Sequence, residues 1–306
     1  MTRVCVAGAG VIGSLFAAFL SRVAEVSVLT RREEHARALT ENGLRVSGRA
    51  DFVARVSAAA VDPAALPEPE LVILASKAND LDALAARLSG SFGDAILMPV
   101  QNGLGADEVV ARHGDWRLLS SVTFMSGTRH SDTHVEYILD TATWIGPDRG
   151  TTGDEAREAA ALIAASGLKA EAFDELRPAL WSKLIFNATV NAVAALTGLP
   201  HDFHFGQLER ETDLGHLVRD LIDEGRAVAA AAGVELKEDP WEMNMLATRR
   251  GFRHYPSMLE DVDARRPTEV DMITGALVRE GARHGVAVPL HTALLRLVKG
   301  KEASWE

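Results

Sequence analysis

The sequence has almost no cysteine, and this scarcity limits the classes of protein to which it can belong. Cys5 is the one cysteine in 306 residues, so no disulfide can form within the chain. No cysteine or histidine spacing resembles that of a zinc site, and we expect no metal centre. A chain without internal disulfides is typical of a reducing compartment, which favours the cytoplasm.

The sequence also lacks an excess of basic residues. Lysine and arginine number 32 against 43 aspartates and glutamates, which gives a formal net charge of −11. Nucleic acids and anionic membranes attract clustered positive charge, so this balance argues against both as partners. No low-complexity stretch, block of like charge or internal repeat is visible. We therefore expect a small-molecule partner, and a small basic pocket for an anionic ligand is compatible with the net charge.

No apolar run is long and clean enough to predict a signal peptide or a membrane span. Residues 4–20 are interrupted by three glycines and follow no basic segment of normal length. Residues 178–200 reach membrane length, but Lys183, Asn187 and Asn191 would each be costly in lipid. The pattern predicts a cytoplasmic protein without a membrane partner.

The chain length predicts two domains, because 306 residues exceed the size at which one core usually stops growing. Strand and helix patterns alternate in the first half, and strand patterns nearly vanish after residues 169–173. We expect an α/β fold class, with a Rossmann dinucleotide-binding domain over 1–174 and an all-helical substrate domain over 175–306. A homodimer is compatible with the sequence, but periodicity cannot separate buried from exposed apolar helix faces.

A glycine-rich turn follows the first predicted strand, Arg3–Ala7, and precedes a helical pattern. The run consists of Gly8, Ala9, Gly10, Val11, Ile12 and Gly13. In a G-x-G-x-x-G turn the first glycine makes the turn, the second admits a pyrophosphate, and the third packs helix on strand. The helix N-terminus then faces the phosphates. This order predicts dinucleotide binding, the alternative being a merely structural turn.

The end of the second predicted strand, Glu25–Leu29, indicates which dinucleotide is bound. A free ribose 2′-hydroxyl usually meets Asp or Glu here, whereas a 2′-phosphate meets Arg. Arg31 and Arg32 occupy this place, and the next two residues, both glutamates, come late for the acidic role. The sequence therefore favours NADP(H) bound by Arg31. The alternative, a solvated residue opening the next helix, fits Arg32 better.

Polar residues follow two further buried-strand patterns, residues 71–76 and 95–100. Lys77 comes after the first, and Asn102 comes after the second within Gln-Asn-Gly-Leu-Gly. Ligands bind beyond the carboxyl ends of parallel strands, so Lys77 is a candidate for cofactor phosphate or ribose and Asn102 for nicotinamide or substrate. A surface lysine and a plain Asn-Gly turn are the alternatives. Residues 120–147 alternate like antiparallel strands extending the sheet, and Thr128 there is a further cofactor candidate.

The segment Pro178–Pro200 carries a narrow polar stripe on an otherwise apolar helix. Lys183, Asn187 and Asn191 recur at four-residue steps, and each step turns the helix by only about 40°. A solvent-exposed face is usually wide and highly charged, so the stripe predicts a polar cleft inside the protein. Further helical patterns cover 208–232, 242–251 and 270–284.

Two other polar residues of this half have simple local interpretations when each is taken alone. Ser257 is most simply a helix cap. Glu269 fits equally well a carboxylate in the first turn of a helix, favoured by the helix dipole.

Together these segments resemble the 2-dehydropantoate 2-reductase (ketopantoate reductase) family along essentially the whole chain. The resemblance rests on an ordered set of motifs, each common by itself but specific in this spacing. They are GAGVIG at 8–13, Lys77, QNGLG at 101–105, WSKLIFNATVN at 181–191, PSMLEDV at 256–262 and RPTEVD at 266–271. The family joins a Rossmann domain to a helical domain of the 6-phosphogluconate-dehydrogenase type, with the active site between them. It reduces 2-dehydropantoate with NADPH to (R)-pantoate for pantothenate and coenzyme A synthesis.

The resemblance also implies roles for individual residues. Lys183 matches the family's proton donor, and Glu269 matches the carboxylate beside it. Asn102 is expected between nicotinamide and substrate. The remaining substrate-binding matches are Asn187, Asn191 and Ser257. An ammonium group suits this chemistry because hydride transfer to a ketone leaves negative charge on its oxygen.

One position departs from the family pattern and leaves the substrate open. Where the family often has an asparagine after the proline, this chain has His201, which can still donate a hydrogen bond to a carboxylate. A different 2-oxo acid or related carbonyl substrate is therefore the first alternative. A non-catalytic NADP(H)-binding sensor is the second, although a sensor would need neither Lys183 nor Glu269.

Overall fold

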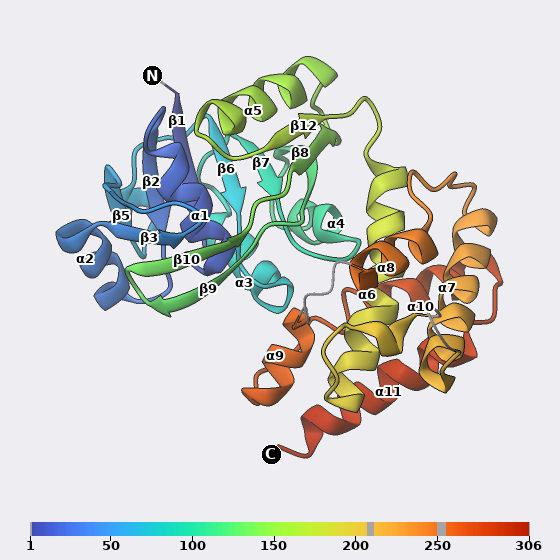
Figure 1. Ribbon diagram of the computed structural model, residues 1–306. Helices are drawn as coiled ribbons and strands as arrows, with labels where there is room; N and C mark the ends of the chain where they lie inside the picture. Colours follow the sequence, from blue (N-terminus) through green and yellow to red (C-terminus); the bar gives the residue numbers. More distant parts are fainter. Residues whose placement is uncertain (1, 207–210, 250–254, 306) are drawn as a thin grey trace. The chain divides into compact units, whose positions relative to one another are not determined.

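The computed structural model describes residues 2–206, 211–249 and 255–305, and it divides into two compact units (Figure 1). One unit runs to Gln101 and resumes over Ala106–Leu176. The other combines Asn102–Gly105 with the chain from Arg177 onward. The α/β fold class is confirmed, because the first unit contains all the strands assigned in the described residues and the second contains only helices.

The first unit is built on an eight-stranded sheet in the order β12-β11-β8-β7-β6-β1-β2-β5. Every neighbouring pair is parallel except β11 and β8. The strands are β1 (Arg3–Ala7), β2 (Glu25–Leu29), β5 (Ala58–Ala60), β6 (Leu71–Leu74), β7 (Ile96–Pro99), β8 (Arg117–Thr123), β11 (Thr143–Pro147) and β12 (Ala170–Ala172). The central strands β1, β6 and β7 are almost wholly buried, as expected for parallel strands covered on both faces.

Helices cover both faces of this sheet. The helices of this unit are α1 (Val11–Leu20), α2 (Glu33–Asn42), α3 (Ala78–Leu88), α4 (Ala106–Ala111) and α5 (Gly153–Ala165), with a 3₁₀ turn η1 (Pro63–Ala65). Side chains of α1 and α5 share one apolar core, whereas those of α3 and α4 belong to a second core. The two cores and the sheet between them form the three layers of a doubly wound fold.

A second sheet of four strands accounts for part of the predicted antiparallel region. Its order is β4-β3-β10-β9, and its strands are β3 (Leu44–Gly48), β4 (Phe52–Ala54), β9 (Ser126–Ser131) and β10 (His134–Leu139). The sequence predicts that residues 120–147 extend the main sheet. The structure ends β8 at Thr123 and begins β9 at Ser126, and of this region only β8 and β11 belong to the main sheet.

The second unit surrounds one long helix, α6 (Arg177–Thr197), which packs against five others. These are α7 (Asp213–Ala231), α8 (Pro240–Arg249), α9 (Ser257–Asp263), α10 (Thr274–His284) and α11 (Pro289–Ala303), with a 3₁₀ turn η2 (Phe203–Phe205). By length and composition α6 passes a test for a membrane span, but 78% of its most apolar window is buried inside the protein. That degree of burial is typical of the core helix of a globular unit.

Two helix starts differ from the sequence prediction. The pattern from Val270 predicts a helix, yet α10 begins at Thr274, because residues 270–273 form a turn that buries Val270 and Ile273 in the core. Glu269 therefore lies before the helix rather than in its first turn. Ser257 is the first residue of α9 and Pro256 holds the cap position, so Ser257 is not the cap. The predicted helices at 208–232 and 242–251 each include residues outside the described ones.

The contact between α6 and α7 leads to a prediction about stability. A methyl group added at Gly225 would lie 2.6 Å from Cγ2 of Ile185, a stiff, buried side chain. Gly225→Ala should therefore destabilise the protein by about 1–3 kcal/mol through overpacking. Gly300→Ala, in α11 where the same methyl group meets nothing within 4 Å, should stabilise it by about 0.5–1 kcal/mol. Urea unfolding followed by circular dichroism measures both, and equal shifts would contradict the packing argument.

Candidate functional site

Three polar side chains from distant parts of the sequence form a hydrogen-bonded chain inside the helical unit. Lys183 on α6 donates from Nζ to Oδ1 of Asn102 at 3.0 Å. Asn102 donates from Nδ2 to Oε2 of Glu269 at 3.3 Å. The amide of Asn102 thus turns its oxygen to the ammonium group and its NH₂ to the carboxylate, the orientation in which both contacts are favourable.

The surroundings of Lys183 suit a group that exchanges a proton near neutral pH. Its side chain lies in the core of the helical unit, and the residue is only 7% exposed. Burial lowers the pKa of Lys183 from its usual 10.5 to about 7, and the negative charge of Glu269 opposes that fall. Both protonation states are therefore available at neutral pH, which is what a general acid requires.

A close backbone contact explains how Asn102 reaches this position. Gly103 has a φ of +97°, and a Cβ there would lie 1.9 Å from the carbonyl oxygen of Met272. The backbone N–H of Leu104 donates to the same oxygen at 3.3 Å. The loop 102–105 therefore docks on the turn that follows Glu269, and only glycine permits so close an approach.

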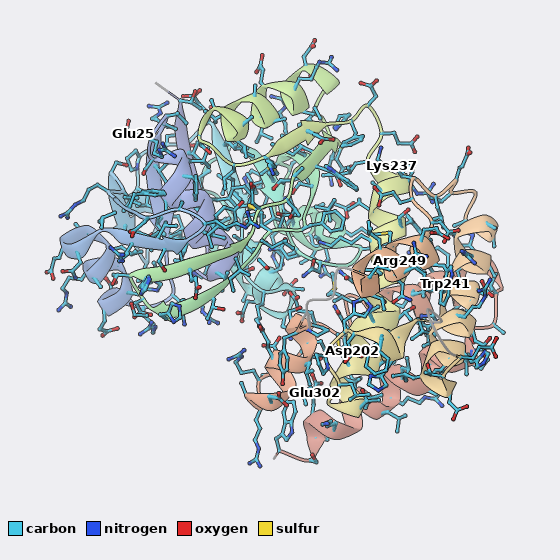
Figure 2. All side chains as sticks on the ribbon, viewed as in Figure 1. Glu25, Asp202, Lys237, Trp241, Arg249 and Glu302 are labelled. Carbon is cyan, nitrogen blue, oxygen red and sulfur yellow. The ribbon has the colours of Figure 1, made fainter. Side chains whose placement is uncertain are left out.

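A side chain of α11 also holds the segment that carries Glu269. Glu302, labelled in Figure 2, accepts a hydrogen bond from the backbone N–H of Thr268 at 2.7 Å. The hydroxyl of Thr268 in turn accepts from the N–H of Val270 at 3.2 Å. These bonds fix the backbone on both sides of Glu269. Glu302 and Thr268 are thus supporting residues that sequence patterns did not single out.

The rest of the predicted stripe continues along α6 from Lys183. Asn187 is half-buried and Asn191 is 7% exposed, in a helix whose other faces are packed. Successive members are about 6 Å apart along the helix axis. The three polar groups therefore span about 12 Å of the helix. Ser257, at the start of α9 in the same unit, is exposed.

His201 lies in a packed cluster beside α6 rather than on the stripe. It is 1% exposed, and its Nε2 is 2.9 Å from Oδ1 of Asn244. Because the NH₂ of Asn244 donates to the carbonyl of Phe205 at 2.8 Å, its oxygen faces His201 and accepts a hydrogen bond from Nε2–H. The rings of Phe186 and Phe205 pack edge-on against the imidazole. A substrate contact by His201 stays a prediction.

The three glycines of the glycine turn differ in their surroundings. Gly8 and Gly13 are required by the backbone, whereas Gly10 has open space beside it. Gly8 has a φ of +106°, and a Cβ at Gly13 would lie 1.8 Å from the carbonyl oxygen of Gly8. At Gly10, by contrast, a Cβ would meet no protein atom nearer than 4.0 Å. Gly10 also caps α1 without a side-chain hydrogen bond, so the first amides of the helix and the space before them suit an anionic group.

Other cofactor candidates gather at the same edge of the sheet. Since β6, β1 and β2 are neighbours, the residues after their carboxyl ends lie at one edge. Lys77 is exposed immediately before α3, and Arg31 is exposed after β2. Thr128 is exposed on β9, beside Gly127, where an added Cβ would lie 3.1 Å from a side-chain methyl of Val11.

Both arginines after β2 are paired with carboxylates that the sequence did not reveal. Arg31 contacts Asp80 in the first turn of α3 at 2.9 Å. Arg32 binds both carboxylate oxygens of Asp132, in the β9–β10 turn, at 2.6 Å. Arg32 is thereby held toward the hairpin, which leaves Arg31 as the more available of the two.

Comparison with known proteins was made over the whole chain. A family model described as ketopantoate reductase PanE/ApbA matches residues 4–150, and one described as its C terminal matches residues 175–302. The 2-dehydropantoate 2-reductase of Streptococcus pyogenes serotype M6 is 30% identical, and the alignment covers 98% of each chain.

Solved structures show the same fold. A PanE/ApbA family ketopantoate reductase from Ralstonia eutropha JMP134 superposes with a TM-score of 0.88 at 28% identity, covering 99% of each chain. D-mandelate dehydrogenase with NADH and anilino(oxo)acetate has a TM-score of 0.88 over 99% of each chain, and at 24% identity it shows likeness of fold alone. The resemblance predicted from the motifs is confirmed, and the chain belongs to the ketopantoate reductase family of oxidoreductases.

Proposed function

We propose that this protein reduces 2-dehydropantoate to (R)-pantoate with NADPH, as a cytoplasmic enzyme of pantothenate and coenzyme A synthesis. The observation that carries the proposal is the buried Lys183, whose pKa is lowered to about 7 and whose ammonium contacts Asn102. A buried lysine whose pKa lies near neutral pH is suited to donating one proton per turnover in a reductase. The net charge of −11 fits a small-molecule substrate.

The reaction divides between the cofactor and the side chains. A bound reduced nicotinamide supplies the hydride that adds to the carbonyl carbon. Lys183 stabilises the negative charge that develops on the carbonyl oxygen and gives that oxygen its proton. Glu269 keeps the pKa of Lys183 from falling further, and Asn102 orients the ammonium group.

The stripe on α6 supplies substrate contacts in this proposal. Asn187 and Asn191 offer amide groups for the carboxylate and hydroxyl of the substrate without adding fixed charge. Ser257 is proposed as a further donor from α9. One ammonium group among neutral amides favours a small anionic substrate. A second cationic side chain beside it would lower the pKa of Lys183 still more.

The cofactor is proposed to bind along the edge formed by the glycine turn. The open side of Gly10 and the N-terminus of α1 are suited to the pyrophosphate. Arg31 is proposed for the ribose 2′-phosphate, and Lys77 and Thr128 for further cofactor contacts. Arginine suits this task because its planar group binds phosphate through two parallel hydrogen bonds.

A second candidate function is the reduction of another 2-oxo acid. D-mandelate dehydrogenase shares the fold, and His201 stands where the family often has asparagine. The imidazole contacts Asn244 and packs edge-on against Phe186, the residue before Asn187 on α6. A substrate with a different side chain is the expected consequence of a histidine at this place.

A panel of 2-oxo acids tests the proposed function. Steady-state oxidation of NADPH should be fastest, by kcat/KM, with 2-dehydropantoate. Equally weak rates with every 2-oxo acid would contradict 2-dehydropantoate as the substrate.

The variant Lys183→Ala tests the role of the lysine. It should lower kcat by about 100-fold or more while the Kd for NADPH changes little, since the lysine acts on the substrate oxygen. Unchanged kcat in Lys183→Ala would contradict Lys183 as the proton donor.

The pH dependence of the reduction should report the protonation of Lys183. Only the protonated amine can donate, so kcat/KM should fall as the pH rises through about 7. Glu269→Gln removes the charge that raises this pKa, and the fall should then begin at lower pH. Glu242→Gln, an exposed change on α8, is the matched control. A fall in kcat/KM that moves to higher pH in Glu269→Gln would contradict the assignment of this titration to Lys183.

The choice of cofactor should depend on Arg31. Arg31→Ala should raise the Kd for NADPH about tenfold, because one charge-assisted phosphate contact is lost. It should raise the Kd for NADH by less than about twofold. Arg32→Ala should have the smaller effect, because Asp132 already engages that guanidinium. Fluorescence titration of both dinucleotides gives the Kd values. Equal losses of NADPH and NADH in Arg31→Ala would exclude a phosphate contact.

A further inference from the structure

The ion pair between Arg31 and Asp80 crosses the edge of the sheet at which the cofactor is proposed to bind. Arg31 follows β2 and Asp80 lies in the first turn of α3, which follows β6. Strand β1, with its glycine turn, lies between these two strands. The pair at 2.9 Å therefore joins the two sides of the glycine turn.

The backbone around this pair is held by contacts that do not involve Asp80. Arg87, on α3, donates to the carbonyl oxygen of Thr30 at 3.1 Å and also bonds the carbonyl of Val61. The N–H of Thr30 donates to Ala60 at 2.9 Å. The residue before Arg31 is thus fixed beside α3, and removing the carboxylate of Asp80 would leave the arginine's backbone in place.

The guanidinium of Arg31 is itself free to exchange partners. Its side chain is 75% exposed and that of Asp80 is 41% exposed, so water screens their attraction. Arg32 differs, because both oxygens of Asp132 bind it and the backbone of Asp132 is tied to His35 at 2.8 Å. Arg31 and Asp80 are therefore an exposed charged pair, at the proposed dinucleotide edge, that can exchange partners.

We propose that Asp80 is a specificity-determining residue that narrows the enzyme's preference for NADPH over NADH. The inference rests on the proposed dinucleotide site and adds an acidic partner that the end of β2 lacks. A carboxylate accepts a hydrogen bond from a ribose 2′-hydroxyl, whereas it repels a 2′-phosphate and competes with it for Arg31. The pair thus recognises both cofactors, Arg31 through the phosphate and Asp80 through the hydroxyl.

Removing one charge tests this role without any use of catalysis. Asp80→Asn should lower the Kd for NADPH about fivefold, the order of one exposed ion pair, and should not lower the Kd for NADH. Asp82→Asn, on the same helix but paired with Arg112 and His113, is the matched control and should change neither value. Titration with adenosine 2′,5′-bisphosphate and with 5′-AMP isolates the ribose substituent from the nicotinamide.

The outcomes separate this inference from the proposed function. Wild-type protein that binds neither dinucleotide would overturn both. Wild-type protein that binds NADPH, with an unchanged NADPH to NADH ratio in Asp80→Asn, would overturn the role of Asp80 alone, as would weaker NADPH binding in that variant. In an Arg31→Ala background the gain from Asp80→Asn should shrink to less than about half, because the competition is gone. An undiminished gain in NADPH affinity in the Arg31→Ala background would contradict competition between Asp80 and the phosphate for Arg31.

Discussion

The burial of one positive charge, the ammonium group of Lys183, is the constraint on which the helical unit depends. An isolated charge in a protein core costs several kcal/mol even after relaxation, so it needs hydrogen bonds and an opposite charge close by. Asn102 supplies the hydrogen bond and Glu269 the charge. The balance leaves the pKa at about 7. The same burial that is unfavourable for folding therefore produces a group suited to proton transfer.

This requirement explains features of the chain that have no chemistry of their own. The loop 102–105 belongs to the helical unit although it interrupts the α/β unit in sequence. It reaches that place through the close contact of Gly103 with Met272, and Glu302 supports the neighbouring turn. A glycine and a carboxylate outside the reacting groups thus fix the distance between the amide and the lysine. Precision at the lysine depends on backbone contacts as much as on polar side chains.

The fold could be predicted from the sequence where local pattern and tertiary packing agree. Strands β1 and β2 begin and end at the predicted residues, because β-branched runs bounded by turn residues are buried on both faces. The prediction failed where a pattern continued through a change of structure. Met125 and Val270 lie outside the strands and helices yet are buried, so periodicity alone could not reveal the break between β8 and β9 or the turn before α10.

The sequence by itself determined the glycine turn, the stripe on α6 and the family, because these depend on residues close together or on an ordered set of motifs. Only the tertiary structure decided which side chains meet. Asn102 and Glu269 are 167 residues apart, and Asp80 is 49 residues from Arg31. Partners at such separations leave no local pattern. Burial lowers the pKa of Lys183 and Glu269 opposes that fall, while Asp80 pairs with Arg31. These effects come from the tertiary structure, since burial and Coulomb attraction depend on distance in space and not along the chain.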